Sequence, residues 1–372
     1  MSVLGLLPAL GGGLGELAST GQTSRLLDGY VARYLTSFDR VRYFTYLVES
    51  LGDFTTDASL LARVDMVAPR QASSRGRRAA TLAWTESHAL RSCAVLRAFQ
   101  VTGTVPAIAA NARFGVPYVT TYGFSYAQLS QPGPKRLLKA AVERLGLRRA
   151  AAVIATTEAL RARAARLARE VHLIPNGVDT QRFAPPPEGR KPGRPARILY
   201  VGRFSPEKNL ETLIAAAAAL TRWLPVHLVF VGAGPLQVRL REQARVAGVD
   251  ITFPGVVPQE RLPPLYAAAD AFVLASFTEG HPKVLLEALA AGVPCVASDC
   301  EGNRSLVVEG ETGLLFDPRR PDELADRLAS VLTDGALAEA LGRSGRAMVV
   351  AGYDLGTLVT AEIALLRRVA TI

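Results

Sequence analysis

One stretch of this chain constrains its fold more than any other. A short apolar run at 271–275 is followed by a polar loop, a helix-forming segment at 282–291 and a second apolar run at 293–297. Both apolar runs have the length and the β-branched or aromatic content of buried strands. Pro282 suits the first helical position and Gly292 suits the position after the helix. The stretch therefore predicts a strand, loop, helix, strand unit.

Two carboxylates, Glu279 and Glu287, lie on either side of the start of this helix. The loop before such a helix lies at the carboxyl end of the strand, where the free N–H groups of the first turn attract anions and polar ligands. Two carboxylates would repel a bare phosphate, so we expect them to accept hydrogen bonds from hydroxyl groups. This combination suits a sugar joined to a phosphate. A structural alternative is that Glu287 pairs with Lys283 while Glu279 caps the helix.

The same stretch resembles the signature of the retaining family-4 glycosyltransferases of the GT-B fold. That signature is Glu, seven residues, Glu in the setting Ser-x-x-Glu-Gly-x-Pro and Glu-Ala-x-Ala-x-Gly-x-Pro. Nine positions match in one register, which disfavours the structural alternative: Ser276, Glu279, Gly280, Pro282, Glu287, Ala288, Ala290, Gly292 and Pro294. The resemblance implies an α/β protein of two doubly wound Rossmann-like domains that face each other across a cleft. A C-terminal helix is expected to cross back to the first domain.

Length and composition agree with two folded domains. At 372 residues the chain is too long for one ordinary core, and its 49% hydrophobic content argues against disorder. No uncharged apolar run approaches the roughly 20 residues that span a bilayer. The first residues lack the basic leading segment of a signal peptide. We therefore expect a protein without a transmembrane segment.

Cysteine usage indicates the cellular compartment, and net charge indicates which classes of partner are compatible with the chain. Cys93, Cys295 and Cys300 form an odd set without metal-ligand spacing, which is typical of a reduced, cytoplasmic protein. The formal charge of +10 suits nucleic acid, anionic lipid or phosphorylated substrates. No aromatic-basic module or zinc motif supports a nucleic-acid partner. We expect a cytoplasmic protein that binds no nucleic acid.

Apolar runs alternate with helix-forming segments, which is the rhythm of a parallel sheet with helices on both faces. Strands are expected at 2–7, 41–46, 64–68, 94–99, 118–121, 152–155, 197–202 and 226–232. A run rich in proline and charge at 185–195 is typical of an interdomain linker. The expected division is an acceptor-side domain at 1–184 with a closing helix at about 353–372, a linker at 185–196, and a nucleotide-sugar-binding domain at 197–352.

Two further matches flank the linker. Residues 174–179 spell Ile-Pro-Asn-Gly-Val-Asp, which the family shows at the end of its first domain. The segment from 201 resembles Val-Gly-Arg-x-x-x-x-Lys-Gly, with Asn209 in place of the last glycine. In the family, the residues that match Arg203 and Lys208 hold the donor diphosphate. Fixed cations in a dry site stabilise the charge that develops on a leaving diphosphate.

The resemblance also implies several donor contacts made by loops. Gly12 and Gly13 follow the first strand, where glycine lets the backbone approach a phosphate, although a flexible turn fits this spacing equally well. Gly234 lies in a similar loop, and Val256 belongs to the segment that matches the one lying against the nucleotide base. The donor-binding residues that we expect are Glu287, Gly12, Gly13, Gly280, His281, Pro282, Gly234 and Val256.

Three positions depart from the family pattern. Tyr122 stands where members often carry a histidine, and its hydroxyl can donate a hydrogen bond or it can be a half-buried aromatic residue. Glu301 and Ser305 replace two of the marked residues of Gly-Gly-x-x-Glu. The contributions of these loops to activity therefore stay open.

Two basic segments, 135–149 and 160–170, have a helical period. Such helices can lie on an anionic membrane, and family members often act on lipid-linked acceptors. The alternative is a core-facing helix with a solvated basic face. Peripheral contact with the inner face of a membrane is therefore one of two hypotheses.

The resemblance predicts a retaining glycosyltransferase that moves a sugar from a nucleoside-diphosphate sugar to an acceptor. Lipid-linked acceptors and cell-envelope or polysaccharide precursors fit this hypothesis. The expected catalytic residues are Glu279, Arg203 and Lys208, and no metal or other cofactor is expected, because no Asp-x-Asp pair occurs. The alternatives are a non-catalytic sugar-nucleotide-binding subunit, or an epimerase or phosphorylase of the same fold.

Overall fold

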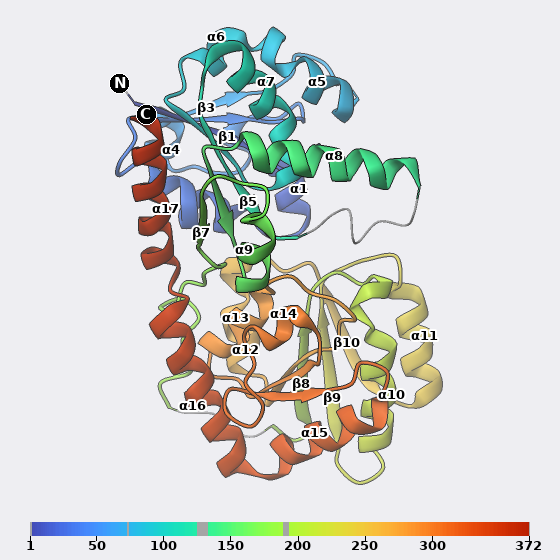
Figure 1. The fold of residues 1–372 in the computed structure, drawn as a ribbon. Helices are drawn as coiled ribbons and strands as arrows, with labels where there is room; N and C mark the ends of the chain where they lie inside the picture. Colours follow the sequence, from blue (N-terminus) through green and yellow to red (C-terminus); the bar gives the residue numbers. More distant parts are fainter. Residues whose placement is uncertain (1, 73, 125–132, 189–192, 372) are drawn as a thin grey trace. The chain divides into compact units, whose positions relative to one another are not determined.

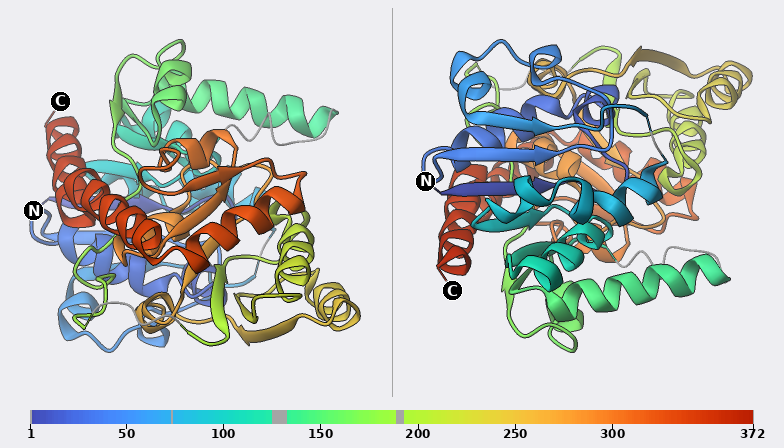
Figure 2. Two further views of the ribbon diagram at one scale, coloured as in Figure 1. Left: turned by 90° about the horizontal axis from the view of Figure 1, so that it is seen from below. Right: turned by 90° about the horizontal axis from the view of Figure 1, so that it is seen from above.

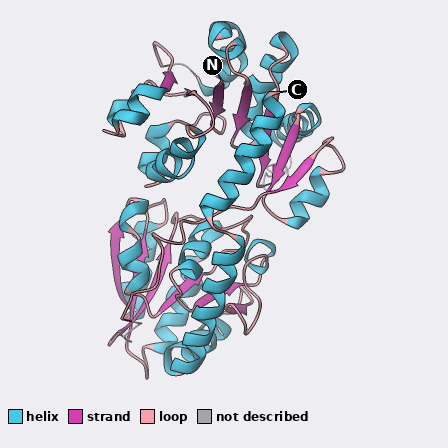
Figure 3. Cartoon of the chain, turned by 90° about the vertical axis from the view of Figure 1, so that its left-hand side faces the viewer, coloured by secondary structure: helices cyan, strands magenta, loops and turns pink. Residues whose placement is uncertain are grey.

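The chain forms two compact α/β units. The computed structural model describes residues 2–72, 74–124, 133–188 and 193–371 (Figure 1). The first unit comprises Met1–Pro175 with Thr357–Ile372, and the second comprises Asn176–Gly356. Within each unit the strands form a sheet with helices around it (Figure 3). The expected α/β class with two Rossmann-like domains is confirmed.

The described part of the first unit contains a seven-stranded parallel sheet in the order β3-β2-β1-β4-β5-β6-β7. The order reverses between β1 and β4, which is the switch point of a doubly wound sheet. Every residue of β1 is buried, as expected for a strand covered on both faces. The strands are β1 (Val3–Leu7), β2 (Arg40–Phe44), β3 (Val64–Val67), β4 (Val95–Ala98), β5 (Tyr118–Tyr122), β6 (Ala152–Ala155) and β7 (Val171–Leu173).

Helices connect these strands. A π-helical turn at Leu27–Val31 joins α2 and α3, so the helical segment after the glycine loop is interrupted. The helices are α1 (Leu14–Ser19), α2 (Thr23–Leu26), α3 (Ala32–Tyr34), α4 (Ala58–Arg63), α5 (Arg75–Thr85), α6 (Ser87–Arg91), α7 (Thr104–Phe114), α8 (Pro134–Arg149) and α9 (Glu158–Ala164). Short 3₁₀ turns occur at Leu51–Asp53 and Val101–Gly103.

The last helix, α17 (Leu355–Ala370), packs into the first unit although it follows the second in sequence. Its Glu362 is 3% exposed and lies 2.5 Å from Nε of Arg97 in β4. The hydroxyl of Tyr34 donates to the same carboxylate oxygen at 2.5 Å. The expected return of the closing helix to the first domain is therefore confirmed.

The described part of the second unit contains a six-stranded parallel sheet in the order β10-β9-β8-β11-β12-β13. The order reverses between β8 and β11, so loops at the carboxyl ends of these strands border the ligand position of a doubly wound sheet. The strands are β8 (Ala196–Val201), β9 (Val226–Val231), β10 (Asp250–Gly255), β11 (Ala271–Leu274), β12 (Cys295–Ser298) and β13 (Leu314–Phe316).

The helices of the second unit bury apolar stripes against this sheet. In α10 (Leu210–Leu220), Leu213, Ala217 and Leu220 recur at the spacing of one helical face and are buried. The others are α11 (Gln237–Ala247), α12 (Pro263–Ala267), α13 (Lys283–Ala290), α14 (Glu301–Arg304), α15 (Pro321–Thr333) and α16 (Gly335–Gly352), with 3₁₀ turns at Pro206–Lys208 (η4) and Gln259–Arg261 (η5). The helix expected at 282–291 is α13, and Gly292 follows it with φ +64°, as a C-terminal cap requires. Pro282, expected at the first helical position, is instead the N-cap, because its backbone is extended.

The chain passes from the first unit to the second at Pro175 and Asn176, earlier than the linker expected at 185–196. The physical reason is that the residues just after the crossing belong to the second core. Val178 and Phe183 are fully buried there, and the N–H of Val178 donates to the carbonyl of Tyr353 at 3.0 Å. Composition marks the proline-rich run, but burial decides which unit a segment joins.

Candidate functional site

The loops that follow β8 and β11 carry most of the expected site residues of the second unit. Parallel strands end at one edge of the sheet, so these loops gather there. The N–H of Phe277, in the β11 loop, donates to the carbonyl of Glu207 in the β8 loop at 2.9 Å. A side chain on Gly302, in α14 after β12, would place its Cβ 2.5 Å from the carbonyl of Glu279. The β11 loop is therefore in direct contact with both the β8 loop and α14.

An ion pair joins two of the expected catalytic residues. Nζ of Lys208 donates to Oε1 of Glu279 at 2.6 Å, and Oγ of Ser276 donates to the same oxygen at 2.6 Å. The Glu279 side chain is 8% exposed and the Lys208 side chain is 21% exposed. Both side chains thus retain some accessible surface, and the ion pair between them fixes their relative position. The structure brings together a cation and a carboxylate that lie 71 residues apart in sequence.

Asn209 stands where the family has a glycine after Lys208, and its backbone and contacts explain how the chain accommodates the change. Its backbone has φ +54°, in the left-handed region that asparagine tolerates better than most residues. Its buried Nδ2 donates to the carbonyls of Ala275 at 3.1 Å and Pro318 at 2.7 Å. The asparagine therefore keeps the turn and adds a link to the end of β11. Sequence reasoning noted the substitution but not this link.

Glu287 is 1% exposed in α13 and has partners that the sequence did not reveal. Its Oε1 accepts from Nε2 of Gln259 at 2.9 Å, and its Oε2 accepts from the hydroxyl of Tyr266 at 3.0 Å. Both donors are buried residues, from η5 and α12 respectively. Both oxygens of the carboxylate thus accept hydrogen bonds, as a buried polar group requires. Its expected contact with ribose hydroxyls stays a prediction.

The loop between Glu279 and α13 is held by contacts around His281. The carbonyl of His281 accepts from Nδ2 of Asn176 at 2.8 Å, which gives the Pro-Asn-Gly motif a structural role. The imidazole is 6% exposed and faces the ring of Tyr353 at 5.5 Å. Burial, assisted by the charge of Lys283, lowers the pKa of His281 from 6.5 to about 4. The imidazole is therefore neutral at physiological pH.

Arg203, Gly234 and Val256 lie at this end of the second sheet. The side chain of Arg203 is exposed, while its carbonyl accepts from the hydroxyl of Tyr200 at 2.9 Å. A Cβ on Gly234 would lie 2.3 Å from the carbonyl oxygen of Phe204, so glycine is required for this close approach of two loops. Val256 is 40% exposed after β10. Arg203 and Val256 are therefore accessible, whereas Gly234 allows the two loops to approach closely, and their contacts with a donor stay predictions.

Gly280 and Pro282 complete the loop, and the departures from the family pattern lie beside it. Gly302 retains the glycine where a Cβ would collide with the carbonyls of Glu279 and Gly280. The hydroxyl of Ser305 donates to the carbonyl of Gly302 at 2.6 Å. Ser305, which replaces the family's glutamate, therefore stabilises the turn through a hydrogen bond from its hydroxyl to the backbone of Gly302.

In the first unit the glycine loop lies against a carboxylate of the protein itself. The N–H groups of Leu14 and Gly15 donate to Oε1 and Oε2 of Glu49 at 2.9 and 2.8 Å. A Cβ on Gly13 would lie 2.5 Å from Oε1 of Glu49. The sequence indicated that Gly12 and Gly13 allow a close approach, but not that Glu49 occupies the start of α1. Their contact with a donor stays a prediction.

Tyr122 is 4% exposed at the end of β5. Its hydroxyl donates to Oε1 of Glu143 in α8 at 2.9 Å, and Glu143 is itself buried. Tyr122 is therefore a fully buried aromatic residue rather than a half-buried one, and its hydroxyl donates a hydrogen bond within its own unit.

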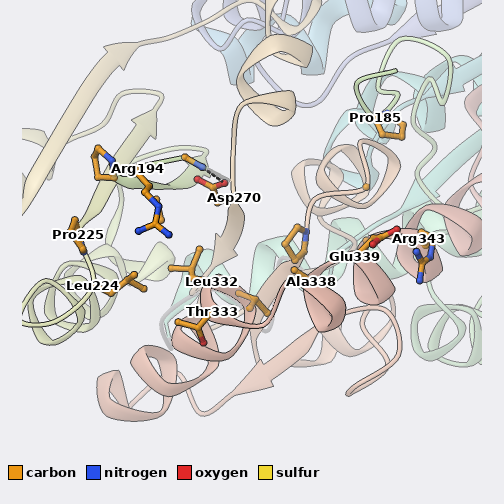
Figure 4. Close-up of a pocket in the computed structure, with 18 of the residues that line it drawn as sticks. Pro185, Arg194, Leu224, Pro225, Asp270, Leu332, Thr333, Ala338, Glu339 and Arg343 are labelled. Carbon is orange, nitrogen blue, oxygen red and sulfur yellow. Dashed lines mark hydrogen bonds and ion pairs between the residues drawn. The ribbon is translucent and has the colours of Figure 1, made fainter. Parts of the chain in front are cut away.

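A cavity of about 1220 Å³ lies elsewhere in the second unit, near the amino ends of β8, β9 and β11. Figure 4 shows Arg194 and Asp270 on one side of it and Glu339 and Arg343 on the other. None of the expected site residues lines it. Within the described stretches no group of three or more His, Cys, Asp or Glu side chains is placed to hold a metal ion. None of the described helices has the length and apolarity needed to cross a bilayer.

Comparison with known families gives two matches. Residues 182–348 match the family model of glycosyl transferases group 1, and residues 61–182 match the model of glycosyltransferase family 4. The chain is 36% identical over 208 residues to a GDP-mannose-dependent α-(1-6)-phosphatidylinositol monomannoside mannosyltransferase of Mycobacterium tuberculosis. That alignment covers 51% of this chain and 54% of the relative, so the chain spans about half the length of the curated relatives it matches.

Solved structures with the same fold cover almost the whole chain. Sucrose-phosphate synthase from Thermosynechococcus elongatus matches with a TM-score of 0.82 and 24% identity, over 99% of each chain. The Anabaena protein Alr3699/HepE in complex with UDP-glucose matches with a TM-score of 0.79 and 20% identity, over 100% of each chain. At these identities the likeness shows the fold alone.

Proposed function

Since this chain belongs to the group 1, family-4 glycosyltransferases, we propose that it transfers a sugar from a nucleoside-diphosphate sugar to an acceptor. The observation that carries the proposal is the contact of Lys208, Glu279 and Ser276 at the carboxyl edge of the second sheet. A cation and a carboxylate lie side by side there, next to the start of α13. A sugar diphosphate presents both of the complementary groups, a phosphate and hydroxyls.

In the proposed reaction, Lys208 and the exposed Arg203 stabilise the negative charge that develops on the departing diphosphate. Glu279 accepts hydrogen bonds from the donor sugar and stabilises positive charge at the anomeric carbon. When the diphosphate binds Lys208, the ion pair between Lys208 and Glu279 weakens. The carboxylate of Glu279 then interacts more strongly with the sugar. Glu287 supports the ribose end of the donor from α13. Transfer is proposed to retain the anomeric configuration and to need no metal ion.

The acceptor is proposed to be lipid-linked or a precursor of the cell envelope or of a polysaccharide, at the cytoplasmic face of an anionic membrane. The name of the mycobacterial relative supports this class, because it specifies transfer to a phosphatidylinositol monomannoside. For the nucleotide, that relative's name specifies GDP-mannose and the HepE complex contains UDP-glucose. The proposal therefore includes both bases as candidates.

The test is a panel of UDP-, GDP- and ADP-sugars, with thermal stabilisation and slow donor hydrolysis measured with and without EDTA. One donor should stabilise the protein and be hydrolysed at a rate that EDTA leaves unchanged. Glu279→Gln should lower that rate about 100- to 1,000-fold while nucleotide binding persists. The control is Glu242→Gln, on the exposed face of α11. Stabilisation without turnover by the unaltered protein, even with acceptors present, would instead support a non-catalytic binding subunit.

A further inference from the structure

Helix α8 (Pro134–Arg149) exposes large apolar side chains on its outer face. Leu137 is 73% exposed, Leu138 is 66% exposed and Leu145 is 45% exposed. Figures 1 and 2 show α8 as a straight rod whose amino-terminal half extends beyond the other helices of the first unit. Exposed leucines gathered on one element differ from the scattered apolar residues of an ordinary surface.

The spacing of these leucines places them together. Leu138 and Leu145 are seven residues apart, or two helical turns, and Leu137 is adjacent to Leu138. The opposite side of α8 faces its own unit, where Leu147 is 1% exposed and the carbonyl of Gly146 accepts from the hydroxyl of Tyr118 at 2.7 Å. The carboxyl-terminal half is therefore anchored in the core, while the apolar stripe points outward.

The charge on the exposed side of α8 has one sign. Arg136, Arg144, Arg148 and Arg149 are all exposed. Glu143 is the one acidic residue in the sequence of this helix, and it is 9% exposed and accepts from Tyr122. Leucines flanked by arginines, without an exposed acid on the helix, complement a surface that is both apolar and anionic.

Helix α11 of the second unit provides a comparison for α8. In α11, Val238 is 81% exposed and Val246 is 71% exposed. The arginines of that helix have acidic partners, since Arg245 contacts Glu242 at 2.7 Å and Arg239 lies 3.8 Å from Glu211. Both helices thus expose large apolar side chains, but α11 also presents the exposed acid Glu242 beside its arginines, whereas the acid of α8, Glu143, is buried.

We propose that α8 is the element by which this protein binds an anionic lipid bilayer. The leucines enter the boundary between headgroups and acyl chains, and the arginines contact lipid phosphates. The inference goes beyond the proposed transfer reaction, because it rests on exposure and charge and needs neither donor nor acceptor. It assigns the membrane contact to one helix, whereas composition indicated two basic segments.

The test is co-sedimentation of the full chain with vesicles of phosphatidylcholine alone or mixed with phosphatidylglycerol, in the absence of any donor. Binding should require phosphatidylglycerol and weaken as salt is raised. Replacing both leucines, Leu137→Ser with Leu138→Ser, should weaken binding about tenfold or more. Arg144→Gln and Arg148→Gln should each weaken it about fivefold.

The matched control is Val238→Ser with Val246→Ser on α11, which should bind vesicles as the unaltered protein does. Circular dichroism verifies that each variant is folded. Unchanged vesicle binding after loss of both leucines, or equal loss in the α11 control, would overturn the proposal. So would a concentration-dependent dimer that the leucine changes abolish, because the face would then belong to a second copy of this chain. Retained donor hydrolysis by the leucine variant would separate this outcome from failure of the proposed function.

Discussion

Each unit contains a short ion pair, and the two pairs differ in exposure. In the second unit Lys208 and Glu279 lie 2.6 Å apart with 21% and 8% of their side chains exposed, and they join two loops at the carboxyl edge of the sheet. In the first unit Arg97 and Glu362 lie 2.5 Å apart with 3% and 5% exposed, and they join β4 to α17. The comparison teaches that an ion pair can fix a helix when it is buried, as in the first unit (the sealed pair), and can keep accessible side-chain surface when it joins two loops, as in the second (the open pair).

The neighbours of each pair strengthen this difference. The hydroxyl of Tyr34 donates to Glu362, and the guanidinium of Arg97 donates to Thr121 at 2.7 Å and to the carbonyl of Ala98 at 2.7 Å. Burial and the charge of Glu362 raise the pKa of Tyr34 well above its usual value, so its hydroxyl stays a donor. The sealed pair is thus surrounded by protein donors and acceptors, whereas Glu279 and Lys208 retain accessible surface.

Breaking the sealed pair should have the largest effect, and on stability. Glu362→Ala leaves the guanidinium of Arg97 buried without its carboxylate, which typically costs about 3–5 kcal/mol. We expect that loss in the unfolding free energy of the first unit, with activity unchanged at temperatures where the variant is folded. The chain has two tryptophans, Trp84 in the first unit and Trp223 in the second. Fluorescence of the first unit can therefore be isolated in a Trp223→Phe background.

The control for this prediction is Glu158→Ala, which breaks an exposed pair with Arg161 in the same unit. Exposed pairs contribute little, so the control should unfold as the parent protein does. A loss of activity in folded Glu362→Ala would show that the sealed pair also serves the reaction, and the comparison would fail.

Breaking the open pair should affect turnover and leave stability nearly unchanged. Lys208→Met removes the cation proposed to stabilise the departing diphosphate, and kcat/KM should fall about 100- to 1,000-fold. The measurement is donor hydrolysis or transfer at saturating and limiting donor. Arg239→Met, at an exposed cation of the same unit, is the control. A large fall in the melting temperature with normal turnover would show that the Lys208–Glu279 pair serves stability, as the Arg97–Glu362 pair does, and not the reaction.

The buried imidazole of His281, in the loop that carries Glu279, makes the stability of the second unit depend on pH. The unfolded state takes up a proton below pH 6.5 and the folded state only below about 4. The unfolded state therefore binds more protons between these values, and stability falls as the pH falls. The full effect is about 3 kcal/mol. Unfolding followed in a Trp84→Phe background should be less acid-sensitive in His281→Gln than in the parent.

The exposed His172, in the first unit, supplies the control for the acid measurement. His172→Gln should keep the parent's dependence on pH in this background, because the Trp223 signal reports the second unit. An identical acid response in His281→Gln and the parent would mean that this imidazole is not shielded from solvent, and that the loop before α13 is more open than the structure has it.

The sequence predicted the central strands well because their apolar runs are long and flanked by turn residues. The edge strands β7, β10 and β13 were not predicted. β7 and β13 have only three residues each. β10 has no buried residue and contains Pro254 and Gly255, which are unusual within a strand. Among the site residues, Glu279 and Lys208 were expected to act on one ligand, and the structure pairs them. Motif spacing can indicate a shared ligand, but it does not give the contact itself.

The partners of the buried groups were not predictable from the sequence. Gln259 and Tyr266 lie 28 and 21 residues from Glu287, and Glu49 lies 35 residues from the N–H of Leu14 that it accepts from. Each is an ordinary polar residue until the fold brings it to a charge or a helix start. A buried charge requires such partners, but local sequence does not say which residues supply them.

The smallest effect is expected where a buried carboxylate loses one neutral donor. Tyr266→Phe removes the hydroxyl that lies 3.0 Å from Oε2 of Glu287 and 3.2 Å from the carbonyl of Val284, and it should destabilise the second unit by about 1–3 kcal/mol. Tyr200→Phe makes the same change at a hydroxyl that donates to the neutral carbonyl of Arg203, and about 0.5–1.5 kcal/mol is expected. Unfolding of both variants in the Trp84→Phe background measures the difference. Equal losses would show that the charge on Glu287 adds nothing to its bond with Tyr266, and the carboxylate would then behave as an accessible group like Glu279.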